Sequence, residues 1–204
     1  MKGLIRTSVL MQAVLDRDTG IRTGELVTHL MFYEPAGYKL LCLTDGGINP
    51  FPDLEKKKVI LEHAAQAFQK LHYPSVTAAC ICGEETIHPA LASNTDAQAL
   101  AAMNDYWRSR YNMTACGPVG LDLAVSKQAV AHKGYPISCA GEADILLVPN
   151  YEVGNAMGKA MSVFSHAPNA GIVLGAQAPI ALVSRADIAR SKLTSMALGC
   201  IFAD

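Results

Sequence analysis

Residues 143–184, ADILLVPNYEVGNAMGKAMSVFSHAPNAGIVLGAQAPIALVS, form the stretch that decides the fold. Its opening run, ADILLVPN, is short and apolar, which predicts a buried strand. The next segment, YEVGNAMGKAMSVFSHA, places Val153, Met157 and Phe164 at helical spacing on one face. Two further apolar runs, AGIVLGA and PIALVS, predict two more strands. Strands and helices therefore alternate here without long gaps, as in α/β proteins.

The same alternation extends upstream and downstream of this stretch. KLLCLTDGG and SVTAACICG predict strands, and DLEKKKVILEHAAQAFQKLHY predicts a helix. NTDAQALAAMNDYWRSRY predicts a helix capped by Asn94 or Thr95, and GLDLAVSKQAVAHKG predicts one that ends at Gly134. A final helix is predicted from about Ala186. We predict a three-layer α/β fold with a mainly parallel sheet.

Composition excludes several classes of function. The 204 residues are 50% hydrophobic, enough for one large domain or two small ones. The net charge of −1 gives no basic field for nucleic acid. The first apolar patch is interrupted by Asp16, Arg17 and Asp18, unlike a signal peptide, and no apolar run reaches membrane-spanning length.

Cysteine and histidine usage predicts neither a disulfide framework nor a metal site. The six cysteines are scattered, and Cys80 and Cys82 lack the spacing of a zinc site. Cys116 is interpreted as a buried structural thiol, and His29 as a hydrogen-bonded core histidine. The six histidines also lack metal-ligand spacing. We therefore expect no metal and a reduced, cytoplasmic compartment.

The segment SRAD, Ser184 to Asp187, has two interpretations. Ser184 followed three residues later by Asp187 matches a capping box, which opens many helices that bind no ligand. A serine hydroxyl can also orient a nucleophile, and a guanidinium such as that of Arg185 can stabilise charge on a carbonyl or phosphoryl oxygen. The pattern leaves both interpretations open.

A second junction between strand and helix, LLVPNYEVGNAMGK, also has two interpretations. Gly154 and Gly158 lie one helical turn apart, which is typical of close packing against a neighbouring element. Alternatively, Gly154 lets an anion approach the backbone while Asn155 and Lys159 supply hydrogen-bond donors. Spacing alone does not separate the two.

Several motifs in fixed order carry a family resemblance over the whole chain. MKGLIRT, GIRTGELVTHLMFYE, TDGGINPFPDLEKK and GPVGLDLAVSKQAVAHKG are followed by VPNYEVGNAMGK and VLGAQAPIALVSRAD. Together they resemble the phosphate acetyl/butyryl transferase family, and its phosphate butyryltransferase branch most closely. The resemblance implies an isocitrate/isopropylmalate dehydrogenase-like architecture. Its first α/β domain would comprise residues 1–25 and 170–204, and its second, inserted α/β domain residues 26–169.

The resemblance also implies a function. Members of the family transfer an acyl group reversibly between coenzyme A and inorganic phosphate, in a cleft between the domains. Ser184 would orient the coenzyme A thiol, Arg185 would stabilise the negative carbonyl oxygen, and Asp187 is the candidate base. The phosphate and acyl side would be lined by Thr7, Gly154, Asn155 and Lys159. Coenzyme A would be a substrate, with no permanently bound cofactor, and the chain would form a homodimer in the cytoplasm.

The sequence departs from the family pattern in three respects. Family members begin upstream of MKGL with a half-domain, so the first domain is expected to be truncated, with an incomplete sheet. Gln12 stands where the family usually has an arginine, for which Arg6 is a possible substitute. Arg190 and Ser191 stand where the family tends to have an acid. These departures support an alternative function, a catalytically weak or inactive relative that binds coenzyme A or acyl phosphate.

Overall fold

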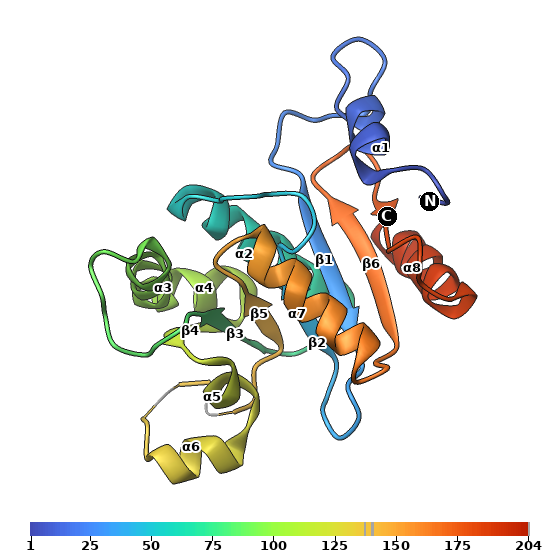
Figure 1. Cartoon of the computed structure of the whole chain (residues 1–204). Coiled ribbons are helices and arrows are strands. Elements are labelled where there is room, and N and C mark those ends of the chain that lie inside the picture. Colours follow the sequence, from blue (N-terminus) through green and yellow to red (C-terminus); the bar gives the residue numbers. More distant parts are fainter. Residues whose placement is uncertain (137, 140, 204) are drawn as a thin grey trace.

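The computed structural model describes residues 1–136, 138–139 and 141–203, and in this part of the chain seven strands form one sheet (Figure 1). The strand order across the sheet is β4-β3-β5-β2-β1-β6-β7. The strands are β1 (Thr28–Tyr33), β2 (Leu41–Thr44), β3 (Val76–Ile81), β4 (Met113–Val119), β5 (Ile145–Leu147), β6 (Asn169–Leu174) and β7 (Ile180–Ala181). Helices lie on both faces, so the expected three layers are present.

The direction of the strands divides the sheet into two halves. The pairings of β4 with β3, β3 with β5, and β5 with β2 are parallel. The pairings of β2 with β1, β1 with β6, and β6 with β7 are antiparallel. The prediction of a mainly parallel sheet is therefore right for one half and wrong for the other. Short connections, residues 34–40 and 175–179, join two of the antiparallel pairs, and a parallel pair needs a longer crossover.

Each face of the sheet packs on its own set of helices. One core joins the sheet to α2 (Leu54–Lys70), α3 (Ala92–Ala102), α4 (Asn104–Tyr111) and α8 (Ala189–Phe202), with Trp107 and Phe68 fully buried. The opposite core includes α5 (Leu121–Val125), α6 (Lys127–Lys133) and α7 (Tyr151–Val163). A third, smaller core holds α1 (Thr7–Val14) against Val173 and Leu182.

Several predicted boundaries need correction. The predicted helix over residues 94–111 is two helices, which meet at Met103, and the first begins after Leu91 rather than at a cap on Asn94 or Thr95. Asn94 is buried instead, and its amide donates to the carbonyl of Glu84. The single helix predicted over GLDLAVSKQAVAHKG is also two helices, α5 and α6. Its predicted end at Gly134 is right, because Gly134 ends α6 in the left-handed conformation, at φ 59°. Strands β1 and β4 went unpredicted because neither shows a clean alternation of apolar and polar residues.

One pair of cysteines differs from the expectation of reduced thiols. Cys116, on β4, is bonded to Cys139 in a disulfide. Cys42, Cys80 and Cys82 are free and buried, which agrees with the interpretation of strand cysteines as small apolar residues. The prediction for Cys116 is therefore right for its burial and wrong for its free thiol.

The sheet continues across the predicted domain boundary, because β1 pairs with β6 over the full length of both strands. The division into residues 1–25 with 170–204 and residues 26–169 stays a prediction. None of the helices described is both long enough and apolar enough to span a bilayer.

Candidate active site

The fold gathers all seven predicted site residues around one cavity of about 400 Å³. Thr7 comes from α1, three residues come from α7, and three follow β7. They are Thr7, Gly154, Asn155, Lys159, Ser184, Arg185 and Asp187. Alternate residues of β1, namely His29, Met31 and Tyr33, also line the cavity, because every second side chain of a strand points to the same face.

The SRAD segment forms a compact turn of its own. The Asp187 carboxylate accepts a hydrogen bond of 2.7 Å from the backbone N–H of Ser184. The Ser184 hydroxyl oxygen accepts a longer one, 3.4 Å, from the N–H of Ala186. Helix α8 begins only at Ala189, and its N-cap is Ile188. The helix-cap interpretation of Ser184 is therefore wrong, and the turn presents Ser184 and Arg185 at the cavity instead.

The glycines of α7 serve close packing. A Cβ on Gly154 would lie 2.7 Å from the Cα of Gly46, and one on Gly158 would lie 2.6 Å from the Tyr33 hydroxyl. The Asn155 amide donates to the carbonyl of Gly46 at 3.3 Å. The packing interpretation therefore holds for both glycines. The same close approach brings Asn155 and Lys159, on this helix, to the wall of the cavity.

The turn after β2, against which α7 packs, is held by the side chain of Asp45, which is buried. One of its carboxylate oxygens accepts from the N–H groups of Gly47 and Ile48, at 2.8 Å each. The other accepts from the His29 N–H at 2.9 Å and from the Asn49 amide at 2.7 Å. Helix α2, which follows this turn, is capped by Asp53.

Two buried residues of the cavity are not among the seven site residues named from the sequence. Lys2 is 3% exposed, and its ammonium donates to the carbonyl of Val183 at 2.9 Å. His29 is 6% exposed, as its interpretation as a core histidine required, and its Nε2 lies 3.2 Å from the carbonyl of Leu182. Its Nδ1 has no hydrogen-bond partner in the described part of the chain. The motif MKGLIRT contained the signal for Lys2, but a lysine near a terminus is usually exposed.

Positive charge predominates in the cavity. Lys2, Lys159 and Arg185 face it, whereas Asp187 is the one acidic residue among the described residues that line it. Burial lowers the pKa of Lys2, and the positive charge of Arg185 lowers it further. Burial raises the pKa of Tyr33 to about 12, and the negative charge of Asp187 acts in the same direction. In a chain of net charge −1, this concentration of cations favours an anionic ligand.

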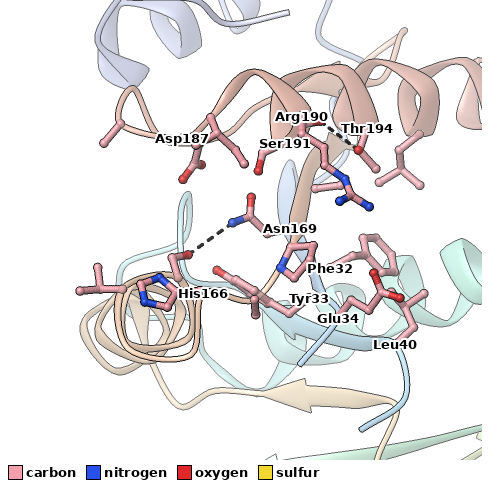
Figure 2. Close-up of a pocket in the computed structure, with 18 of the residues that line it drawn as sticks. Phe32, Tyr33, Glu34, Leu40, His166, Asn169, Asp187, Arg190, Ser191 and Thr194 are labelled. Carbon is pink, nitrogen blue, oxygen red and sulfur yellow. Dashed lines mark hydrogen bonds between the residues drawn. The ribbon is translucent and has the colours of Figure 1, made fainter. Parts of the chain in front are cut away.

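The residues that depart from the family pattern lie outside this cavity. Gln12 and Arg6 are exposed on and beside α1, and neither lines it. Arg190 and Ser191 line a second cavity of about 620 Å³, which adjoins the first at Tyr33 and Asp187. Figure 2 shows Arg190, Ser191 and Thr194 on one side of it, and Tyr33, Glu34 and His166 on the other. Arg6 therefore does not substitute for the missing arginine at the cavity.

Within the described residues no group of three or more histidine, cysteine, aspartate or glutamate side chains is placed to hold a metal ion.

Comparison with known proteins identifies the family. The sequence profile of the family described as phosphate acetyl/butaryl transferase matches residues 1–200. The chain belongs to this family. It is 37% identical to phosphate butyryltransferase of Clostridium acetobutylicum, over 100% of the chain and 67% of that protein. It is 40% identical to the probable phosphate butyryltransferase of Bacillus subtilis, over 97% of the chain and 66% of that protein. The chain thus spans about two thirds of the length of these relatives.

Solved structures agree with this assignment. A branched-chain phosphotransacylase from Enterococcus faecalis superimposes with a TM-score of 0.88 at 32% identity, covering 99% of the chain and 72% of that protein. A phosphotransacetylase from Streptococcus pyogenes superimposes with a TM-score of 0.74 at 15% identity, covering 98% of the chain and 61% of that protein, and it supports the fold alone. The family resemblance predicted from the sequence is confirmed.

The buried His29 makes stability depend on pH in a defined direction. Burial lowers its pKa from the ordinary value of 6.5, outweighing the opposite effect of Asp45. The unfolded chain therefore binds a proton at a higher pH than the folded chain. We expect the titration of His29 to leave the free energy of unfolding unchanged above about pH 6.5. Below that pH, protonation of His29 in the unfolded chain should lower the free energy of unfolding by up to about 1.4 kcal/mol per pH unit.

Urea unfolding of the wild type and of His29→Gln between pH 7.5 and 5.5 measures this contribution. The glutamine amide can still donate to Leu182, but it does not titrate. His63, whose pKa burial also lowers, is present in both proteins, so the difference in slope isolates His29. Equal slopes in the two proteins would contradict the prediction.

Proposed function

We propose that this chain transfers a short acyl group, butyryl-like in size, reversibly between coenzyme A and inorganic phosphate. The proposal rests on one observation: Ser184, Arg185 and Lys159 line the same cavity, and the described residues around it carry more positive than negative charge. Both substrates are anions in water, and acyl phosphate carries its charge beside the carbon that reacts. The names of the relatives, phosphate butyryltransferase and phosphotransacylase, point to the same reaction.

Arg185 would act on the transition state of this transfer. The thiol sulfur of coenzyme A attacks the carbonyl carbon of the acyl phosphate, a C–S bond forms, and the C–O bond to phosphate then breaks. Negative charge grows on the carbonyl oxygen during the attack, where a guanidinium stabilises it. The described residues give Arg185 no ion pair within the chain, so its guanidinium can engage the substrate.

Ser184 and Asp187 would handle the thiol. The Ser184 hydroxyl orients the sulfur, and the turn closed by Asp187 fixes the position of this hydroxyl. One carboxylate oxygen of Asp187 holds the turn, and we propose that the other takes the proton that the thiol loses. The phosphate group would bind to Thr7, Asn155 and Lys159, and Gly154 lets helix α7 come close enough to place them.

We also propose the finer features that the resemblance implies: the dehydrogenase-like architecture, the two-domain division, a homodimer, cytoplasmic location and no permanently bound cofactor. The α7 glycines pack within the chain, so a dimer would use another surface. Exposed apolar side chains on and beside α8, Ile188, Leu193 and Met196, support association.

Sedimentation velocity at micromolar concentration tests the dimer. We expect one species of twice the chain mass, because association removes exposed apolar surface from water. A monomer at this concentration would contradict the proposed dimer. The dehydrogenase-like architecture is a separate proposal, which a crystal structure would test.

Replacing Arg185 by alanine tests the proposed reaction. We expect turnover to fall at least about a hundredfold, because loss of a group that stabilises the oxyanion costs roughly 3 kcal/mol in the transition state. The measurement is thiol release from butyryl-CoA with phosphate, compared with acetyl-CoA. Arg190→Ala is the matched control, since Arg190 lies outside the first cavity.

Wild-type turnover that survives Arg185→Ala would show that the reaction occurs elsewhere. Absence of turnover with every acyl-CoA would favour the alternative, a relative that binds coenzyme A or acyl phosphate without catalysis. Equilibrium dialysis with coenzyme A would then measure the binding.

The variant Asp187→Asn separates the two roles of this side chain. The asparagine oxygen can still accept from the Ser184 N–H, but it takes no proton. We expect the melting temperature to stay nearly unchanged, and turnover to fall by at least about a hundredfold, the lower range for a general base. If Asp187 only holds the turn, turnover of Asp187→Asn will match the wild type, whereas Asp187→Ala will lower both turnover and stability.

A further inference from the structure

Lys2 occupies an unusual position for a lysine at the start of a chain. It is 3% exposed and lines the first cavity together with Ser184 and Arg185. Its backbone N–H donates to the carbonyl of Ala181 at 3.0 Å, and its ammonium donates to the carbonyl of Val183 at 2.9 Å. Two hydrogen bonds thus attach this residue to the segment that leads directly into the SRAD turn.

The buried ammonium lacks a full set of partners. An ammonium has three N–H donors, and the structure gives that of Lys2 one acceptor within the described residues, the carbonyl of Val183. None of the described carboxylates lies within ion-pair distance of it. Burying a charge without such a partner is costly, so the remaining donors need an acceptor in the cavity.

The charges around Lys2 favour a negatively charged acceptor. Arg185 and Lys192 lower the pKa of Lys2 by repulsion, Asp187 acts in the opposite direction, and burial is the largest cause of the shift. Burial lowers the pKa of His29, on β1, which disfavours a further positive charge there, and Lys159 faces the same cavity from α7. An anion placed between Lys2 and Arg185 would relieve this repulsion and use the vacant donors of both groups.

We propose that Lys2 is a substrate-binding residue, whose ammonium donates to an oxygen of phosphate or of the phosphoryl group of an acyl phosphate. The inference deepens the proposed function and rests on it. Lys2 would pair with Arg185 across the ligand, with Arg185 on the carbonyl oxygen and Lys2 on the phosphoryl oxygens. Its bond to Val183 then has a second purpose, because it fixes the ammonium beside the SRAD turn.

The rival explanation is that Lys2 only ties the start of the chain to Val183. Calorimetric titration with inorganic phosphate separates the two explanations in the wild type, Lys2→Met, Lys2→Arg and the control Lys192→Met. Methionine retains the apolar stem and removes the ammonium. Lys192 is close enough to repel Lys2, but it does not line the cavity.

We expect Lys2→Met to bind phosphate about ten- to a hundredfold more weakly, the effect of losing one charge-assisted hydrogen bond. Lys192→Met should bind as the wild type does. Wild-type affinity should fall as the pH rises through the lowered pKa of Lys2, because the ammonium loses its charge. Lys2→Arg should restore binding and keep it at high pH, because a guanidinium stays protonated.

Lys2→Met with unchanged phosphate affinity and a lower melting temperature would overturn the inference and leave the proposed function standing. If Lys2→Met does not fold, the test rests on Lys2→Arg. The inference is overturned if the phosphate affinity of Lys2→Arg falls with rising pH as steeply as that of the wild type. A wild type that neither binds phosphate nor turns over acyl-CoA overturns the inference and the proposed function together.

Discussion

The arrangement of the cavity depends on one buried carboxylate, that of Asp45. Its two oxygens accept four hydrogen bonds, from the N–H groups of His29, Gly47 and Ile48 and from the Asn49 amide. These bonds join the beginning of β1 to the glycine turn after β2. A buried carboxylate needs such a full set of donors to offset its loss of water. These bonds hold the turn in the conformation in which its Gly46 packs against Gly154 of α7.

The cavity lies where the parallel half of the sheet meets the antiparallel half. Strands β2 and β5 belong to the parallel half, and the turn and helix that follow them supply Gly46, Gly47 and the α7 residues. Strand β1 begins the antiparallel half and supplies His29, Met31 and Tyr33. Ligands of open α/β sheets bind beyond the carboxyl ends of strands, where the connections diverge. The candidate site, between α7 and the segment after β7, has this position.

The charged groups around the cavity are held in place by contacts within the chain. The SRAD turn is held by its own hydrogen bonds, so Ser184 and Arg185 are presented without helix α8. Lys2 adds a cation from the other end of the chain, and its pKa is lowered because water is largely excluded from it. For the proposed reaction, such groups would already be in place around an anion, which would limit the reorganisation needed as charge develops in the transition state.

The sequence by itself determined the class of fold and the family. Apolar runs and helical periodicity predict strands β2, β3, β5, β6 and β7 and helices α2 and α7, because both signals are local. The motifs ending in SRAD named seven residues that line one cavity. Only the tertiary structure decided the antiparallel pairing in one half of the sheet, the separation of the SRAD turn from α8, the burial of Lys2 and the place of His29 at the cavity. Those features rest on contacts between distant segments, such as Lys2 with Val183 and His29 with Asp45 and Leu182, which no local pattern encodes.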